Sequence, residues 1–170
     1  MRDERVRELL TIELVPHTSW YKNVRSHVSR EEWERLRKLT AERAGHRCEI
    51  CRGRGDKWPV ECHEIFAYDD ATHVQRLVKL IALCPACHEV KHLGLAGVRG
   101  RRAAAIAHLA RVNHWSTADA ELYAEASFEL WHRRSNHKWT LDLSHLEGFG
   151  IKGVGDQRHA AGGGDADEVY

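Results

Sequence analysis

The chain of 170 residues carries 26 basic and 25 acidic side chains, which gives a formal net charge of only +1. This length is usual for one domain, and a hydrophobic content of 42% is enough for a core in part of the chain. The balanced charge excludes a global basic field, so a nucleic-acid partner would have to be held by local clusters. No apolar run approaches the roughly 20 residues that span a bilayer, and we expect no membrane partner.

Five cysteines, four of them in two Cys-x-x-Cys pairs, indicate metal-bound thiolates rather than disulfides. The first ten residues, MRDERVRELL, are charged and contain no apolar signal segment. Together these features predict a reducing, cytoplasmic location.

Composition divides the chain into three parts. Residues 1–28 are expected to form a short charged helix, up to residue 14, and then an ordered loop. In that loop Trp20 and Tyr21 are expected to pack on the core rather than form an arm on DNA. Residues 29–151 are expected to form the domain itself. Residues 152–170, which include GGGDADE, lack the apolar content to fold and are predicted to be disordered.

A capping box marks the first long helix. Ser29 is followed three residues later by Glu32, a spacing at which each side chain satisfies an orphan backbone amide. We predict a helix over residues 30–44 that buries Leu36 and ends at Gly45. This helix leads into the first cysteine pair.

The text between the two cysteine pairs predicts a β-hairpin. Residues 60–68 alternate in the manner of a strand, residues 69–72 have the composition of a turn, and residues 75–83 are rich in Val, Leu and Ile. Pro85 then suits the first turn of a helix. On that helix His88 and His92, four residues apart, would project from the same face.

Two further helices and a strand are expected after the hairpin. Residues 101–112 are rich in Ala, with Ile106 inward, and Ser116 is followed by Asp119 at the start of a helix that continues to residue 134. Residues 139–143 alternate like a strand. The apolar side of the later helix is predicted to comprise Leu122, Tyr123, Ala126, Leu130 and Trp131.

Four thiols would provide the tetrahedral sulfur shell that structural Zn²⁺ prefers. The alternative is that some of them are buried small apolar groups, but two paired motifs favour metal. The remaining thiol, Cys62, is either a free core thiol, which we favour, or a fifth candidate ligand. The predicted zinc ligands are Cys48, Cys51, Cys84 and Cys87.

A second, catalytic site is predicted from the histidines. His63, His88 and His92 could hold one divalent cation, Mg²⁺, Mn²⁺, Ni²⁺ or Zn²⁺, with Glu64 beside it as base or as an additional ligand. Phosphodiester hydrolysis needs such a base and such a cation. The alternative is coincidence among 13 histidines, with Glu64 facing solvent.

The motifs CEIC, VECHEI and LCPACHEVKH, within residues 47–92, resemble the HNH endonucleases of the His-Me finger superfamily whose core is stapled by a four-cysteine zinc. This resemblance implies an α+β fold with a zinc-stapled ββα-metal, treble-clef-like core, here with flanking α-helices. It also implies a hydrolase that cuts phosphodiester bonds, as a DNA endonuclease or nickase, with DNA as partner.

In that family a metal ligand and then the base histidine precede an Ile. Aligning that Ile with Ile65 puts His63 at the ligand position and Glu64 at the base position. Lys79 occupies the position of a family Asn. A shift of one residue would make His63 the base and Cys62 a ligand, but a thiolate is a poor ligand for a hard cation.

These departures leave a second function open: a non-catalytic zinc module, derived from the HNH fold, that binds DNA or another protein. Two basic groups could contact phosphates on either side of the site, although charged runs are commonly just solvated surface. They are Arg52, Arg54 and Lys57 in the knuckle loop, and Arg99, Arg101 and Arg102 after the histidine helix.

Overall fold

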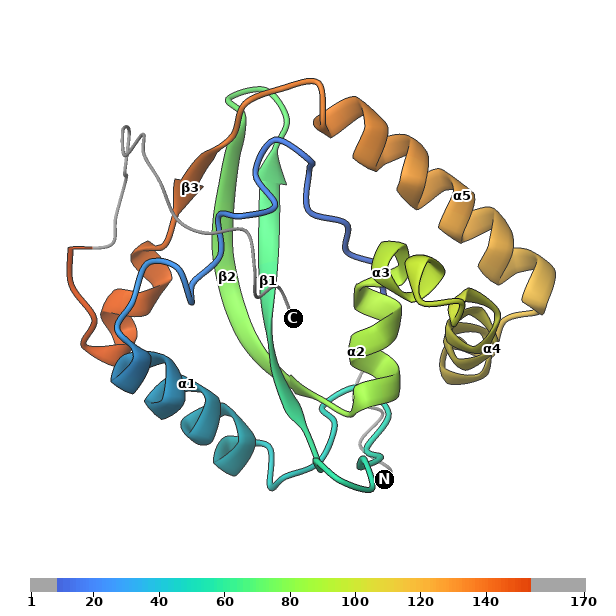
Figure 1. Cartoon of the computed structure of the whole chain (residues 1–170), viewed down its shortest axis with the longest axis horizontal. Helices are drawn as coiled ribbons and strands as arrows, with labels where there is room; N and C mark the ends of the chain where they lie inside the picture. Colours follow the sequence, from blue (N-terminus) through green and yellow to red (C-terminus); the bar gives the residue numbers. More distant parts are fainter. Residues whose placement is uncertain (1–8, 154–170) are drawn as a thin grey trace, which may run out of the picture.

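The computed structural model describes residues 9–153, which form an α+β fold around a three-stranded sheet. Strands β1 (Glu61–Asp69) and β2 (Val74–Leu83) pair as an antiparallel hairpin, which confirms the predicted hairpin. Strand β3 (Thr140–Asp142) confirms the predicted third strand and lies parallel to β2. In Figure 1 the hairpin runs through the middle of the molecule, with helices on both sides of it.

The hairpin register decides which β1 side chains face which helices. His63 lies opposite Ile81 and Glu64 opposite Leu80, and successive side chains on a strand point to opposite faces. Cys62 contacts Thr40 of α1 (Arg30–Arg43), with 3.7 Å between Sγ and Oγ1. One face of β1 therefore looks toward α1, and the other toward the helix that follows β2.

The predicted capping box is present at the start of α1. The Ser29 amide donates to Glu32 Oε2 at 2.8 Å, and the Glu32 amide donates to Ser29 Oγ at 3.2 Å. After β2, Pro85 begins α2 (Pro85–Lys91) as expected. A second short helix, α3 (Leu93–Val98), follows at once and was not predicted.

Helices α4 (Arg102–Asn113) and α5 (Thr117–Arg134) confirm the two helices expected after α2, and α5 begins with the predicted Ser116 cap. The predicted inward face of α5 is partly wrong, because Leu122 is 64% exposed. Ala120 and Ala124 are the fully buried side chains of α5, since small residues let it lie close to α4. None of the described helices combines the length and the apolar character needed to cross a membrane.

The sheet separates two hydrophobic cores. One core joins the thiols and β2 to helices α2 to α5, and includes Ile81, Leu93 and Ile106. The other joins β2 to α1 and to the short 3-10 helix η1 (Ser144–Phe149), an element that was not predicted.

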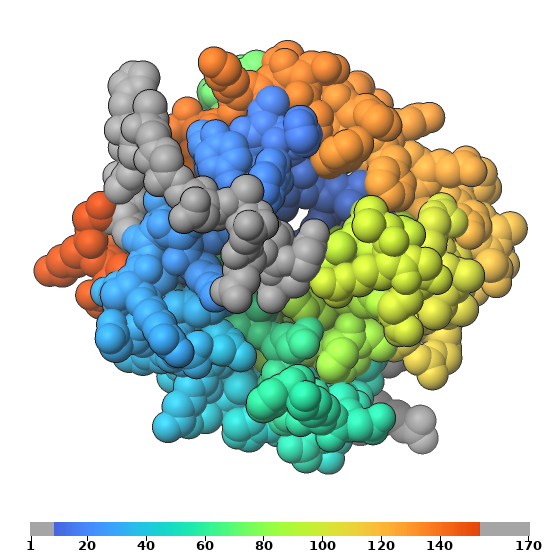
Figure 2. Space-filling view, viewed as in Figure 1, coloured from blue at the N-terminus to red at the C-terminus, as the bar shows by residue number. Residues whose placement is uncertain are grey.

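The segment before α1 is not helical where the structure describes it. Residues 9–14 carry no helix, so that part of the predicted N-terminal helix is wrong, and residues 1–8 lie outside the described range. Trp20 and Tyr21 are 46% and 55% exposed, so their expected burial is also wrong. Figure 2 shows this segment, in blue, on the surface beside α5, in orange. The tail predicted to be disordered lies outside the described residues from residue 154 on.

A buried amide attaches this segment to the helices. The Leu10 amide donates to Asn113 Oδ1 at 2.9 Å, and Asn113 Nδ2 donates to the Leu10 carbonyl at 2.8 Å. Asn113 and Leu10 are both buried. The segment is therefore held in register against the end of α4 by a pair of hydrogen bonds that solvent does not reach.

Asn113→Ala is expected to lower the free energy of unfolding by about 1–3 kcal/mol, because two buried backbone groups of Leu10 lose their partners. Urea denaturation measures the change. Asn136→Ala is the matched control, because Asn136 is exposed at the end of α5. Equal stability of the two variants would contradict the assigned role of Asn113.

Candidate metal centres

The structure brings together both sets of ligands predicted from the sequence. Within each set, one ligand atom per residue lies within 4.8 Å of those of the other members. Glu64 and Cys62 belong to neither set. The first set comprises Cys48, Cys51, Cys84 and Cys87, and the second comprises His63, His88 and His92.

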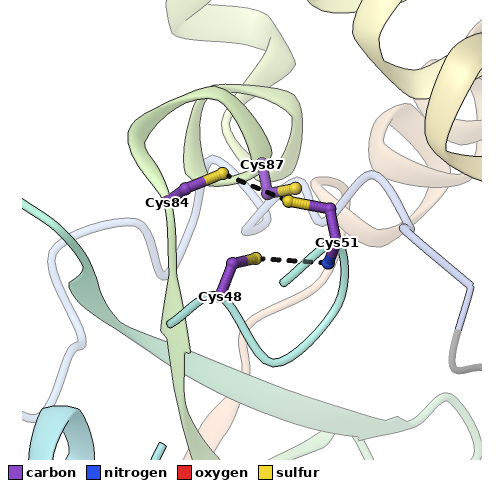
Figure 3. A group of neighbouring side chains, drawn as sticks. All are labelled: Cys48, Cys51, Cys84 and Cys87. Carbon is purple, nitrogen blue, oxygen red and sulfur yellow. Dashed lines mark hydrogen bonds between the residues drawn. The ribbon is translucent and has the colours of Figure 1, made fainter. Parts of the chain in front are cut away.

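The four thiols lie at the open end of the hairpin, two before β1 and two after β2 (Figure 3). Cys48 and Cys51 lie in a tight knuckle before β1, while Cys84 caps α2 and Cys87 lies in its first turn. In the knuckle, the Cys51 amide donates to Cys48 Sγ at 3.5 Å and the Gly53 amide donates to Cys51 Sγ at 3.3 Å. A Cβ at Gly53 would lie 3.2 Å from Cys51 Sγ, so a small residue keeps this turn close to the sulfur.

The thiol spacing fits zinc. Sulfurs bound to one tetrahedral zinc at about 2.3 Å lie about 3.8 Å apart, and the Cys51 and Cys84 sulfurs are 3.5 Å apart. A hydrogen bond from Cys84 lowers the pKa of Cys48, while the same contact raises the pKa of Cys84 to about 11. The crowded thiols thus oppose one another's ionisation, and a cation among them would remove that conflict.

His108 of α4 also contacts this centre, with its Nε2 3.1 Å from Cys87 Sγ. An N–H donor at a thiolate is a typical outer partner of a zinc site. Sequence reasoning missed His108 because it lies 21 residues beyond Cys87, on another helix, and no motif spacing connects the two.

The three imidazoles lie between β1 and the end of α2. His63 is a buried residue of β1, and His88 and His92 lie one turn apart at the end of α2. His88 Nε2 and His92 Nε2 are 3.1 Å apart. Two nitrogens bound to one tetrahedral ion at about 2.0–2.1 Å lie about 3.3 Å apart. The observed spacing therefore suits a shared ion.

Carboxylates contact one ring nitrogen of two of the three imidazoles. Glu61 Oε2 lies 2.5 Å from His88 Nδ1, which leaves Nε2 of His88 for a ligand, and Glu13 Oε2 lies 3.0 Å from His63 Nε2. Carboxylate partners of this kind orient metal-binding histidines. Glu61 could have been found from sequence, since it precedes His63 by two residues and shares its strand face. Glu13, 50 residues from His63, left no such signal.

A buried ammonium completes this arrangement. Lys91 is 2% exposed, and its Nζ donates to Glu13 Oε1 at 2.6 Å and to Thr11 Oγ1 at 2.7 Å. Burial raises the pKa of Glu13, but the hydrogen bond from His63 and the charge of Lys91 outweigh it and lower that pKa overall. Glu13 is therefore a carboxylate at neutral pH.

Burial keeps two of the imidazoles neutral. It lowers the pKa of His63, and it lowers the pKa of His92 to about 3, helped by the neighbouring rings of His63 and His88. Neutral imidazole is the form that binds a cation or accepts a proton. The site is therefore ready for either role at pH 7.

Glu64 and Lys79 take other partners. The Val24 amide donates to Glu64 Oε1 at 2.5 Å, and burial raises the pKa of this carboxyl to about 7. Lys79 Nζ lies 3.4 Å from Glu49 Oε1. Each of the two positions that depart from the HNH pattern is thus engaged outside the imidazole group.

The basic groups predicted to contact DNA differ in their surroundings. Arg101 pairs with Glu89 at 2.5 Å and Arg102 with Glu121 at 2.7 Å. In the knuckle loop the basic side chains are exposed, and Lys57 Nζ lies over the Trp58 ring, 5.8 Å from its centroid. These exposed basic residues are Arg52, Arg54 and Lys57.

Comparison of the chain with protein-family models, with curated proteins and with solved structures finds no match. The two ligand groups therefore carry the functional assignment.

Cys84→Ser is expected to lose the bound metal and to unfold at a lower temperature, because a structural zinc contributes directly to folding. Metal content per chain and a thermal melt under reducing conditions measure this. Cys62→Ser is the control, since Cys62 faces α1, and it should retain one metal per chain. A full equivalent of zinc in Cys84→Ser would show that the four-thiol centre is wrongly assigned.

Proposed function

We propose that this protein is a metal-dependent DNA endonuclease or nickase of the HNH type. In this proposal zinc at the four cysteines holds a treble-clef-like ββα-metal core, and a second divalent cation binds at His63, His88 and His92. The proposal includes a reducing, cytoplasmic location, where thiols remain available to zinc. The observation that carries it is an imidazole group, separate from the four thiols, at the junction of β1 and α2.

The surroundings of the imidazoles argue against coincidence. Surface histidines seldom converge, whereas here two rings are held by carboxylates, from Glu61 and Glu13, and two Nε2 atoms are 3.1 Å apart. The order hairpin then helix, with thiols before β1 and at the start of α2, is the order that the proposed core requires.

A divalent cation at this site would stabilise the charge that develops on a phosphodiester and lower the pKa of an attacking water. The chain supplies the rest. Glu61 orients His88, and neutral His63 is able to bind the cation or to accept the proton of the water. Glu64 would first have to leave the Val24 amide. His63 could act as base only if His88 and His92 alone held the cation, because a nitrogen that binds the cation cannot also accept a proton.

DNA is the proposed partner because the exposed basic side chains of the knuckle loop, Arg52, Arg54 and Lys57, can contact phosphates by local charge. Arg101 and Arg102 are expected to contribute less to DNA binding, because each is paired with a glutamate.

The second candidate is a non-catalytic zinc module that binds DNA or another protein. The hydrogen bond between Glu64 and Val24 and the ion pair between Lys79 and Glu49 favour it. These two residues replace the His and Asn of the HNH pattern, and neither contacts the imidazoles through these bonds. The two candidates differ in whether the chain cuts DNA.

His92→Ala is expected to slow plasmid cleavage in Mg²⁺, Mn²⁺ or Ni²⁺ by more than about 100-fold. Loss of a residue that only orients a metal ligand costs up to about 100-fold, and loss of a ligand itself should cost more. The four-thiol zinc should be retained. His132→Ala, at an exposed position of α5, is the control and should cut at the normal rate. Binding of DNA by the unaltered protein without cleavage in any of the three cations would overturn the nuclease in favour of the module.

Glu61→Gln is expected to weaken binding of the second cation about 10–100-fold, because His88 loses the carboxylate that orients its ring. Calorimetric titration of the zinc-loaded protein with Mn²⁺ or Ni²⁺ measures this without any cleavage assay. Glu129→Gln, on the exposed side of α5, should leave the affinity unchanged. An unchanged affinity in Glu61→Gln would mean that Glu61 does not orient His88 for the cation.

A further inference from the structure

A cavity of about 270 Å³ lies beside the imidazole group, between the N-terminal segment, the far half of β1 and helix α5. Figure 2 shows the two outer walls of the cavity on the surface, the N-terminal segment in blue and α5 in orange. The side chains that give the cavity its chemistry are Glu13, Phe66, Tyr68, Tyr123, Trp131 and Arg134.

One wall is shared with the candidate catalytic site. Glu13 lines the cavity, and its carboxylate is also the partner of His63 at 3.0 Å. A group bound in the cavity would therefore lie one side chain away from the imidazoles. No other described carboxylate contacts both places.

The cavity is lined by four aromatic and four aliphatic side chains, and its free polar atoms are chiefly donors. The Tyr68 hydroxyl makes no hydrogen bond to the described residues, and burial raises its pKa, so it keeps its proton. The Tyr123 hydroxyl accepts from the Ile12 amide at 3.3 Å and retains its own hydrogen to donate. Arg134 binds Asp70 through Nε and Nη2 at 2.8 Å each, which leaves Nη1.

These features select a class of ligand. Aromatic walls favour a flat ring, and hydroxyl and guanidinium donors favour a ring that carries acceptors. The volume is just below the about 300 Å³ at which pockets for drug-sized ligands begin, so one ring system fits. A nucleobase has this size, shape and acceptor pattern.

We propose that this cavity is a subsite for one unstacked nucleobase of the nucleic acid whose phosphodiester lies at the imidazole group. The inference rests on the proposed function for its substrate, but binding in the cavity needs no cleavage. The base would lie between the rings of β1 and α5, and its acceptors would face Tyr68, Tyr123 and Arg134.

The test is an NMR titration of the zinc-loaded full chain, which measures direct binding of nucleoside 5′-monophosphates. Deoxyribose 5-phosphate, which lacks the base, serves as the reference ligand. Ala126 lies at the mouth of the cavity on an exposed position of α5, so Ala126→Phe fills the cavity without disturbing the core. Ala107→Phe makes the same change at an exposed position of α4 away from the cavity and is the matched control.

At least one nucleotide is expected to bind saturably while deoxyribose phosphate does not. Ala126→Phe should weaken that binding at least about 10-fold, the scale of one stacked base, and Ala107→Phe should not change it. Tyr68→Phe should weaken it about 3–10-fold with no loss of thermal stability, because the deleted hydroxyl has no partner to lose.

The proposal is overturned if no nucleotide binds, if deoxyribose phosphate binds as well as the nucleotides do, or if Ala126→Phe binds like the unaltered protein. Nucleotide binding that Ala126→Phe abolishes supports the subsite even in a protein that cuts no DNA. Conversely, DNA cleavage that is unaffected by Ala126→Phe, with no nucleotide binding, would remove the subsite and leave the nuclease standing.

Discussion

The clustering of four thiols in one place is the interaction on which the rest of the structure depends. Cys84 and Cys87 fix the start of α2, and Cys48 and Cys51 fix the chain just before β1, so their meeting holds the helix against the strand. Thiols this close resist joint ionisation, and the contact with Cys48 raises the pKa of Cys84. A cation bound among them would remove that repulsion, and it would hold the start of α2 against the chain that leads into β1, so that the end of α2 lies near His63.

The N-terminal segment is the second constraint, and it connects three features that lie far apart in the chain. Asn113 holds Leu10 by two buried hydrogen bonds, and three residues later Glu13 reaches His63 and Lys91. The same segment forms a wall of the cavity under α5. The attachment at Leu10 is therefore what allows a carboxylate from outside the cysteine and histidine motifs to complete the imidazole group.

Local patterns predicted most of the helices, the hairpin and both ligand sets, because caps, Pro85 and ligand spacing act over a few residues. The features that were predicted wrongly or missed depend on contacts between residues far apart in the sequence. The periodicity of the N-terminal residues predicts a helix, but residues 9–14 carry none and bond instead to Asn113 of α4 and Lys91 of α2. Leu122 fitted an apolar stripe, yet close packing of α5 selects Ala120 and Ala124. Glu13 and His108 meet their partners only through tertiary structure, and no spacing rule could have found them.

The alternation of side chains between the two faces of β1 explains why its acidic residues have different partners. Glu61 and His63 are two apart and share a face, so the carboxylate of Glu61 can hold a ring of α2 beside His63. Glu64 is one residue further on and faces α1, where the Val24 amide takes its carboxylate. A motif alignment treats His63 and Glu64 as neighbours in one site, whereas a pleated strand separates them. The base of the proposed reaction should therefore be sought on the face that Glu61 and His63 share.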